Sequence, residues 1–189
     1  MKPFYFKHKC AGCDYIFLSP RLGDQSYGLF LLRTKLCEVA FLDSFADGAF
    51  DELRVLFDEE KSQFLWIKKG NWVEVFHWIY KISCDPAPSG LQYRLNQPPR
   101  CPKCHSHKMS WWKETYPPQF GEEDLPVVTH KHWDSLSLEE KRQAVIQAIE
   151  DYYREEYPNY LAEEQKSIER LKKIKNKPYY KEPSSDGKS

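Results

Sequence analysis

The sequence predicts an α+β fold, and three observations lead to that prediction. Two Cys-x-x-Cys pairs, at Cys10/Cys13 and Cys101/Cys104, each lie between segments of strand-like composition. Apolar runs of strand length follow the first pair, whereas residues 47–60 carry apolar side chains at helical spacing. Because 41% of the 189 residues are hydrophobic and 15% are aromatic, the chain can form one good-sized core.

The N-terminal residues and the composition indicate a reducing compartment. The opening stretch, MKPFYFKHKC, holds an apolar patch far shorter than the roughly 7 to 15 residues of a signal-peptide core. No run reaches the roughly 18 apolar residues that a membrane span requires. We therefore expect a cytoplasmic protein that does not enter membranes and whose six cysteines form no disulfide framework.

The second cysteine pair, in CPKCHSHKM, has three interpretations: c-type haem attachment, thiol redox chemistry, or half of a metal site. Haem attachment normally follows export, and nothing in the sequence indicates export. A redox pair usually begins a helix after a strand, but here Pro98 and Pro99 precede the pair and a strand-like MSWWKETY follows it. This context argues against redox chemistry without excluding it.

The two pairs together can offer four thiolates to one tetrahedral ion. Zinc suits four soft thiolates, at Zn–S distances of about 2.3 Å. Each turn favours a positive φ after its second cysteine, where Asp14 and His105 stand, and both residue types visit that region more readily than most. His105 and His107 lie beside the second pair, and the sequence leaves open whether either replaces a cysteine ligand.

In residues 3–19 and 90–116 the sequence resembles zinc-ribbon proteins, a fold-level class, through these cysteines alone. The resemblance implies a structural Zn²⁺ in a small antiparallel ribbon and says nothing firm about activity. The implied ligands are Cys10, Cys13, Cys101 and Cys104. The arms of one hairpin would be FYFKHKC and CDYIFL, and those of another LQYRL and KMSWWKETY. Ribbons commonly separate their pairs by roughly 15 to 20 residues, whereas 87 residues lie between these two pairs.

The predicted fold is thus an antiparallel zinc ribbon with a large α+β insertion between its two cysteine turns, or knuckles, and a helical C-terminal arm. Residues 1–130 comprise the ribbon, the insertion (20–89) and a Pro-rich connector (117–130). The helical arm (131–175) and a disordered tail (176–189) follow. Closing the longer loop costs about 1.4 kcal/mol more than closing a usual one. Structural zinc contributes on the order of 10 kcal/mol in small peptides, so such an insertion is tolerated.

Local patterns predict the elements of the insertion. YGLFLL and CEVAFL are typical of a hairpin, and DGAFDELRVLFDEE of a short helix with Asp47 as its N-cap. FLWIKKGNWVEVFHWIY is predicted to form two β segments whose aromatic side chains belong to the core.

In the C-terminal part, SLEE at 137–140 is a capping box that begins a helix, which Pro158 ends. A second helix is predicted from Asn159 to about Lys175. Its apolar stripe is thin, so this helix either projects into solvent or docks on a partner. The stripe consists of Leu161, Ile168, Leu171 and Ile174.

The sequence lacks common catalytic motifs, since it holds no Gly-x-Ser-x-Gly, Walker loop or His-Glu-x-x-His. A zinc ion bound by four thiolates has no open position for a substrate. We therefore expect a protein without enzymatic activity, and no small-molecule substrate is evident.

Charge alternates in blocks along a chain of zero net charge, with −7 over residues 37–60 and −8 over residues 116–164. These blocks and the thin-striped helix favour a protein partner. The protein would act as an adaptor or inhibitor, for example as an immunity or antitoxin protein that neutralises a basic enzyme. The alternative is a nucleic-acid-binding protein that uses the basic, Trp-containing face of the ribbon. The candidate partner-binding residues are Lys103, Lys108, Trp111, Trp112, Leu161, Ile168 and Leu171.

Overall fold

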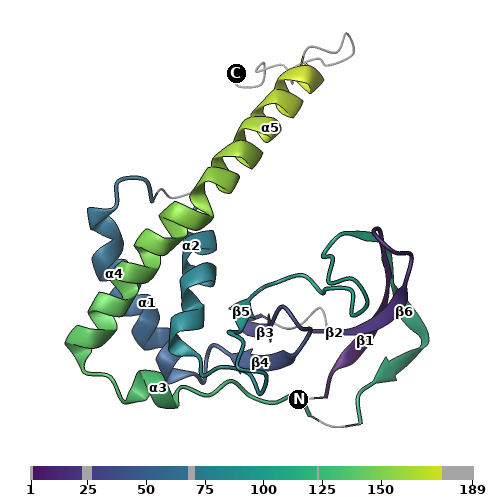
Figure 1. Ribbon diagram of the computed structural model, residues 1–189, viewed down its shortest axis with the longest axis horizontal. Helices are drawn as coiled ribbons and strands as arrows, with labels where there is room; N and C mark the ends of the chain where they lie inside the picture. The colour runs from purple at the N-terminus through teal and green to yellow at the C-terminus, as the bar shows by residue number, and fades with distance from the viewer. Residues whose placement is uncertain (1, 23–26, 68–70, 123, 176–189) are drawn as a thin grey trace, which may run out of the picture. The chain divides into compact units, whose positions relative to one another are not determined.

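The computed structural model describes residues 2–22, 27–67, 71–122 and 124–175 (Figure 1). Within them the fold is mixed α+β, with two three-stranded antiparallel sheets and five α-helices, which confirms the predicted class. The tail predicted to be disordered, 176–189, lies outside the described residues.

The first sheet has the strand order β2-β1-β6. Its central strand β1 (Phe4–Cys10) forms the predicted hairpin with β2 (Ile16–Arg21). On its other side β1 pairs antiparallel with β6 (Met109–Phe120), a strand that comes almost a hundred residues later. This sheet therefore joins the N-terminal segment to the segment that follows the second knuckle.

The predicted hairpin between residues 91–95 and 108–116 does not form. Instead β5 (Arg94–Leu95) joins the second sheet, while β6 occupies the free edge of β1. Strand length explains the difference: β5 has only two residues, whereas β1 offers β6 seven paired positions.

The second sheet has the order β4-β3-β5, built on the predicted hairpin of β3 (Leu29–Arg33) and β4 (Val39–Asp43). The Pro-rich connector runs along the outer edge of β4. There the Phe41 amide donates to the Pro126 carbonyl at 2.8 Å, and the Phe41 carbonyl accepts from Val128 at 3.0 Å. The edge of β4 is thus covered by the chain itself.

Helix α1 (Gly48–Glu60) begins as predicted, because the Asp47 carboxylate accepts a hydrogen bond from the Phe50 amide at 2.7 Å. Its apolar face is buried, with Leu53 and Phe57 fully shielded from solvent. A 3₁₀ turn, η1 (Lys61–Gln63), follows it.

The prediction of two β segments in residues 64–80 is wrong: the described residues of the first, 64–67, contain no strand, and the second forms helix α2 (Trp72–Ile79) and the start of the 3₁₀ turn η2 (Tyr80–Ser83). The two-residue spacing of the aromatic side chains suggested a strand, but Phe76 and Tyr80 are also about one helical turn apart. The Phe76 ring lies 5.2 Å from that of Phe50 and 5.7 Å from that of Phe57. Packing against α1 therefore overrides the β-propensity of the segment.

Helices α3 (Lys131–Asp134) and α4 (Leu138–Glu155) follow the connector. The capping box forms as predicted: the Ser137 amide donates to the Glu140 carboxylate at 2.8 Å, and the Glu140 amide donates to the Ser137 hydroxyl at 3.3 Å. Glu52 of α1 accepts from the indole of Trp133 and the ammonium of Lys141, both at 2.8 Å. These bonds fasten α3 and the start of α4 to α1.

The chain divides into two compact units between Ile149 and Glu150. The second unit contains α5 (Tyr157–Lys175), which begins slightly earlier than predicted. Pro158 lies in its first turn, where the missing N–H leaves no helical hydrogen bond unmade. From residue 161 to 173 every side chain of α5 is exposed. Among the described residues, no helix is both long enough and apolar enough to cross a membrane.

His130 connects three parts of the first unit. Its Nε2 lies 2.8 Å from Asp47 Oδ2 at the start of α1, and its Nδ1 lies 2.6 Å from the Ser83 carbonyl oxygen of η2. Burial disfavours the charged imidazole, but the bonds to Asp47 and Ser83 outweigh it and raise the pKa of His130. Burial likewise opposes the Asp47 carboxylate, yet His130 and the Phe50 amide lower its pKa.

We predict that Asp47→Ala lowers the free energy of unfolding by about 2 to 3 kcal/mol, because it removes both the helix cap and the partner of His130. Asp58→Ala, on the exposed surface of the same helix, is the matched control and should change it by less than about 0.5 kcal/mol. Urea denaturation of both variants measures the difference. If both substitutions lowered the free energy of unfolding equally, the buried pair of Asp47 and His130 would not stabilise the fold more than an exposed residue does.

The pair also predicts a pH dependence. Because the folded pKa of His130 is above its ordinary value of 6.5, its contribution is complete below about pH 6.5 and declines as pH rises through the folded value. Because the pKa of Asp47 is below its ordinary value of 3.8, its contribution is lost only as pH falls through that lower value. His130→Gln should therefore destabilise the protein more at pH 6 than at pH 8.5, as measured by urea denaturation at both values.

Candidate metal centre

The pairing of β1 with β6 brings the two knuckles together. Cys10 is the last residue of β1 and stands opposite Met109, the first residue of β6. Just beyond this pair, the Ala11 amide donates to the Lys108 carbonyl at 2.9 Å. The second knuckle is thereby held beside the first, although 87 residues separate Cys13 from Cys101.

The two knuckles have the same backbone hydrogen bonds. The residue after the second cysteine donates to the carbonyl of the first, from Asp14 to Cys10 at 3.1 Å and from His105 to Cys101 at 2.8 Å. The amide of each first cysteine donates to the carbonyl five residues later, at 3.0 Å and 2.9 Å. Asp14 and His105 both have φ of 57°, which confirms the predicted positive φ.

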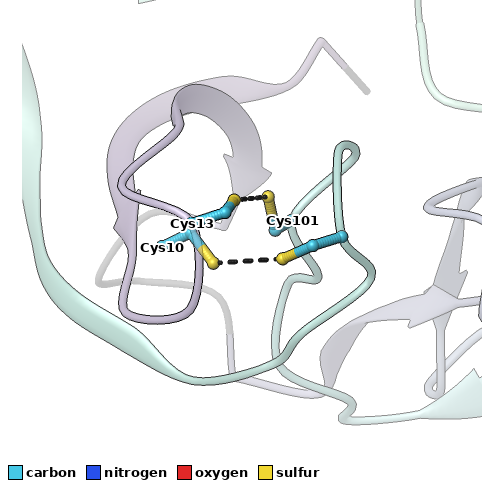
Figure 2. Close-up of side chains that lie close together, drawn as sticks. Cys10, Cys13 and Cys101 are labelled. Atoms are coloured by element: carbon cyan, nitrogen blue, oxygen red, sulfur yellow. Dashed lines mark hydrogen bonds between the residues drawn. The ribbon is translucent and has the colours of Figure 1, made fainter.

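The four thiols lie within 4.8 Å of one another and form a cluster that could bind a metal ion. The sulfur of Cys10 is 3.4 Å from that of Cys104, and the sulfur of Cys13 is 3.5 Å from that of Cys101. Figure 2 shows the thiols of Cys10, Cys13 and Cys101 directed into one small space. Tetrahedral zinc with Zn–S bonds of about 2.3 Å has sulfur–sulfur distances of about 3.8 Å. The two closest sulfur pairs are a few tenths of an ångström shorter than this and all separations are at most 4.8 Å, so the cluster could close around a zinc ion with adjustments of up to about 1 Å.

The cluster is closed on one side and open on the other. Cys10 and Cys101 are fully buried and pack with Phe17 and Met109, whereas Cys104 is exposed. The Gly12 amide points at the Cys10 sulfur, 3.3 Å away, and stabilises negative charge there. This combination of an apolar support and an amide donor suits a bound thiolate.

The ionisation of the thiols is uneven. Burial opposes the thiolate of Cys10, but the Gly12 amide and the Cys104 thiol donate to it and lower its pKa to about 7. For Cys13, the Tyr15 amide favours the thiolate, but burial and the three neighbouring thiols outweigh it and raise the pKa to about 12. A divalent cation removes this conflict, because it stabilises all four thiolates together.

The two histidines of the second knuckle lie outside the cluster. His105 and His107 are exposed, and within the described residues the potential metal-ligating groups that converge are the four cysteines. The fold thus gathers a complete set of four sulfur ligands without either imidazole.

The other candidate site residues are distributed over separate surfaces. Lys103 and Lys108 are exposed on the second knuckle. Trp111 and Trp112 project to opposite faces of the first sheet, since they are neighbours in β6. Leu161, Ile168 and Leu171 are 44%, 40% and 60% exposed on α5.

A second feature, which the sequence analysis missed, is a cavity of about 660 Å³ beside the metal centre, lined by residues of both sheets. Three basic side chains line it: His8, Arg21 and Arg33. The signal for Arg33 was present in the sequence as a charged residue at the end of the apolar run LFLLR. The cavity itself depends on the relative placement of the two sheets, which no local pattern reports.

The fold and the site define a mixed α+β protein with a four-cysteine cluster that can hold a metal ion. No protein-family model matches the chain, and no curated protein and no solved structure matches it either. The function must therefore be argued from the site and from the surfaces of the molecule.

We predict that the purified protein carries about one zinc ion per chain and that Cys101→Ser loses the metal and melts at a lower temperature. The matched control is Cys84→Ala, which removes a buried thiol outside the cluster and should retain the metal. Elemental analysis and thermal unfolding provide the two readouts. Normal metal content and melting temperature in Cys101→Ser would refute the assignment of these ligands.

Proposed function

We propose that this protein is a non-catalytic zinc-ribbon protein in which a structural Zn²⁺ joins two distant segments of the chain. The observation that carries the proposal is the convergence of four thiols, two from each knuckle, within 4.8 Å. Four thiolates complete the tetrahedron of zinc and leave no position for a substrate or a reactive water. A metal bound in this way has a structural role.

The metal would stabilise the part of the first unit that has the least regular structure. Residues 96–108, between β5 and β6, contain no described helix or strand, yet they carry the second knuckle. A ligand that binds only the folded chain adds its binding free energy to the stability of the fold. Zinc would therefore fix this loop against the end of β1.

For the partner, we assign the binding surface to α5. Leu161, Ile168 and Leu171 are spaced by seven and three residues, so they lie on one side of the helix, and all three are exposed. A helix in a protein gains most of its stability when such an apolar stripe packs against another surface. The expected partner is a protein with an apolar groove or helix that covers the stripe, so that the chain acts as an adaptor or inhibitor.

A second candidate function, nucleic-acid binding, is favoured by the outer face of the first sheet. There β1 and β6 place Lys7 directly opposite Lys113, and both side chains are exposed. Like charges opposite each other in a sheet are unfavourable, and a bound polyanion would relieve their repulsion. Trp111 lies beside them on the same face, with its ring 5.2 Å from the Lys113 ammonium, and could stack on a base.

We predict that the double variant Leu161→Glu/Leu171→Glu loses its protein partner, with an affinity reduced by at least about a hundredfold, because two apolar side chains no longer bury in the interface. The tagged proteins are used for affinity capture from the native cells, with and without nuclease. The matched control is Ala162→Glu/Lys173→Gln, which makes the same change in net charge on the other side of α5 and should still capture the partner.

A third variant, Lys7→Gln/Lys113→Gln, separates the two candidate functions. Stoichiometric protein capture that resists nuclease and depends on the α5 stripe supports the protein partner. Capture that disappears with nuclease and depends on the lysine pair would transfer the function to the sheet face. Equal capture by all variants would contradict both assignments.

A further inference from the structure

The cavity beside the metal centre is lined by apolar side chains together with cationic groups that form no ion pair with a carboxylate of the described residues. It lies between residues of β1, β2 and β6 on one side and residues of β3 on the other, all within the first unit. Its volume, about 660 Å³, falls in the range of roughly 300 to 1,000 Å³ that is typical of small-molecule sites. Among the described residues that line it, none is acidic.

Arg33, at the end of β3, is a largely buried cation with neutral partners. Its terminal nitrogens donate to the carbonyl oxygens of Gln97 at 3.0 Å and Pro20 at 2.6 Å. Its Nε is buried and has no hydrogen-bond partner among the described residues. Burial lowers the pKa of Arg33 to about 10, which reflects a charge that lacks an anion.

Arg21, at the end of β2, lies over aromatic rings. Its guanidinium carbon is 4.5 Å from the centroid of the Trp112 ring and 4.8 Å from that of Phe6. These contacts orient the guanidinium, but a ring face does not neutralise its charge. In the ranges that the structure describes, neither Arg21 nor Arg33 forms an ion pair with a carboxylate.

His8 is a third polar side chain of the cavity. Only 8% of its surface is exposed, it lines the cavity, and its Nδ1 finds no hydrogen-bond partner among the described residues. The ring is held in place by stacking on Phe17, with centroids 5.5 Å apart. A buried polar atom without a partner is unfavourable, so a hydrogen-bonding group that reached this nitrogen would be stabilised.

We propose that this cavity binds a small phosphate-bearing molecule of nucleotide size, with its phosphate between His8, Arg21 and Arg33. Two arginines and a histidine can donate to the three terminal oxygens of a phosphate monoester, one more oxygen than a carboxylate offers. The organic part of the ligand would lie against Trp112 and the apolar side of the cavity. This proposal does not rest on the proposed partner surface on α5.

The cavity depends on the metal centre through β1 and β6. His8 lies two residues before Cys10 in the sequence, and Met109 both lines the cavity and packs on the cysteine cluster. Binding must therefore be tested on the whole 189-residue chain loaded with zinc, so that loss of the site is not confused with loss of the metal.

The test is calorimetric titration of the zinc-loaded protein with AMP, inorganic phosphate and adenosine. AMP should bind with a dissociation constant below about 1 mM, phosphate should bind more weakly and compete with AMP, and adenosine should not bind measurably. Arg21→Gln should weaken AMP binding by at least tenfold. The matched control is Arg54→Gln, which removes an exposed guanidinium from α1, outside the cavity lining, and should leave binding unchanged.

Arg33→Gln serves as a second variant, and its zinc content and thermal unfolding are checked first because the side chain is largely buried. If it folds, AMP binding should fall by at least tenfold, as for Arg21→Gln. The absence of AMP and phosphate binding up to about 10 mM, where the binding free energy is below about 3 kcal/mol, would overturn the proposal. Equal weakening by Arg21→Gln and Arg54→Gln would also overturn it, because that result indicates non-specific attraction to positive charge.

Discussion

The antiparallel pairing of β1 with β6 is the constraint on which the site and its surroundings depend. It places the end of β1, and thus Cys10, beside the second knuckle. Because side chains alternate along a strand, the same pairing directs His8 and Trp112 to the cavity side and Lys7 and Lys113 to the outer side. A slip of one residue would exchange the two faces and separate the thiols.

Local chemistry explains which parts of the fold could be predicted. The cap at Asp47, the capping box at Ser137 and the positive φ of Asp14 each depend on a few neighbouring residues, so their sequence patterns are specific. The four-cysteine cluster could also be predicted, although its halves are distant, because one Cys-x-x-Cys pair offers two ligands and the sequence holds a second pair that completes a tetrahedral set.

The parts that were not predicted depend on packing between distant segments. The segment containing α2 has apolar residues at both two-residue and four-residue spacing, and the contact between Phe76 and Phe50 decides in favour of the helix. The partner of β6 is determined by which strand edge is free once β5 has joined β3. Arg21 and Arg33 line one cavity only because two sheets face each other, an arrangement without a local sequence pattern.

The position of the knuckles at the two ends of the insertion has a consequence for chain connectivity. With a metal bound, the 87 residues between Cys13 and Cys101 would form a closed ring, fastened where the chain enters and where it leaves. A single cut in the backbone of this ring would produce two fragments that stay attached through the ion. Such a nicked protein would migrate as one species until a chelator released the metal, and then as two. The same closure would allow new chain termini to be opened within the insertion while the ribbon remains intact.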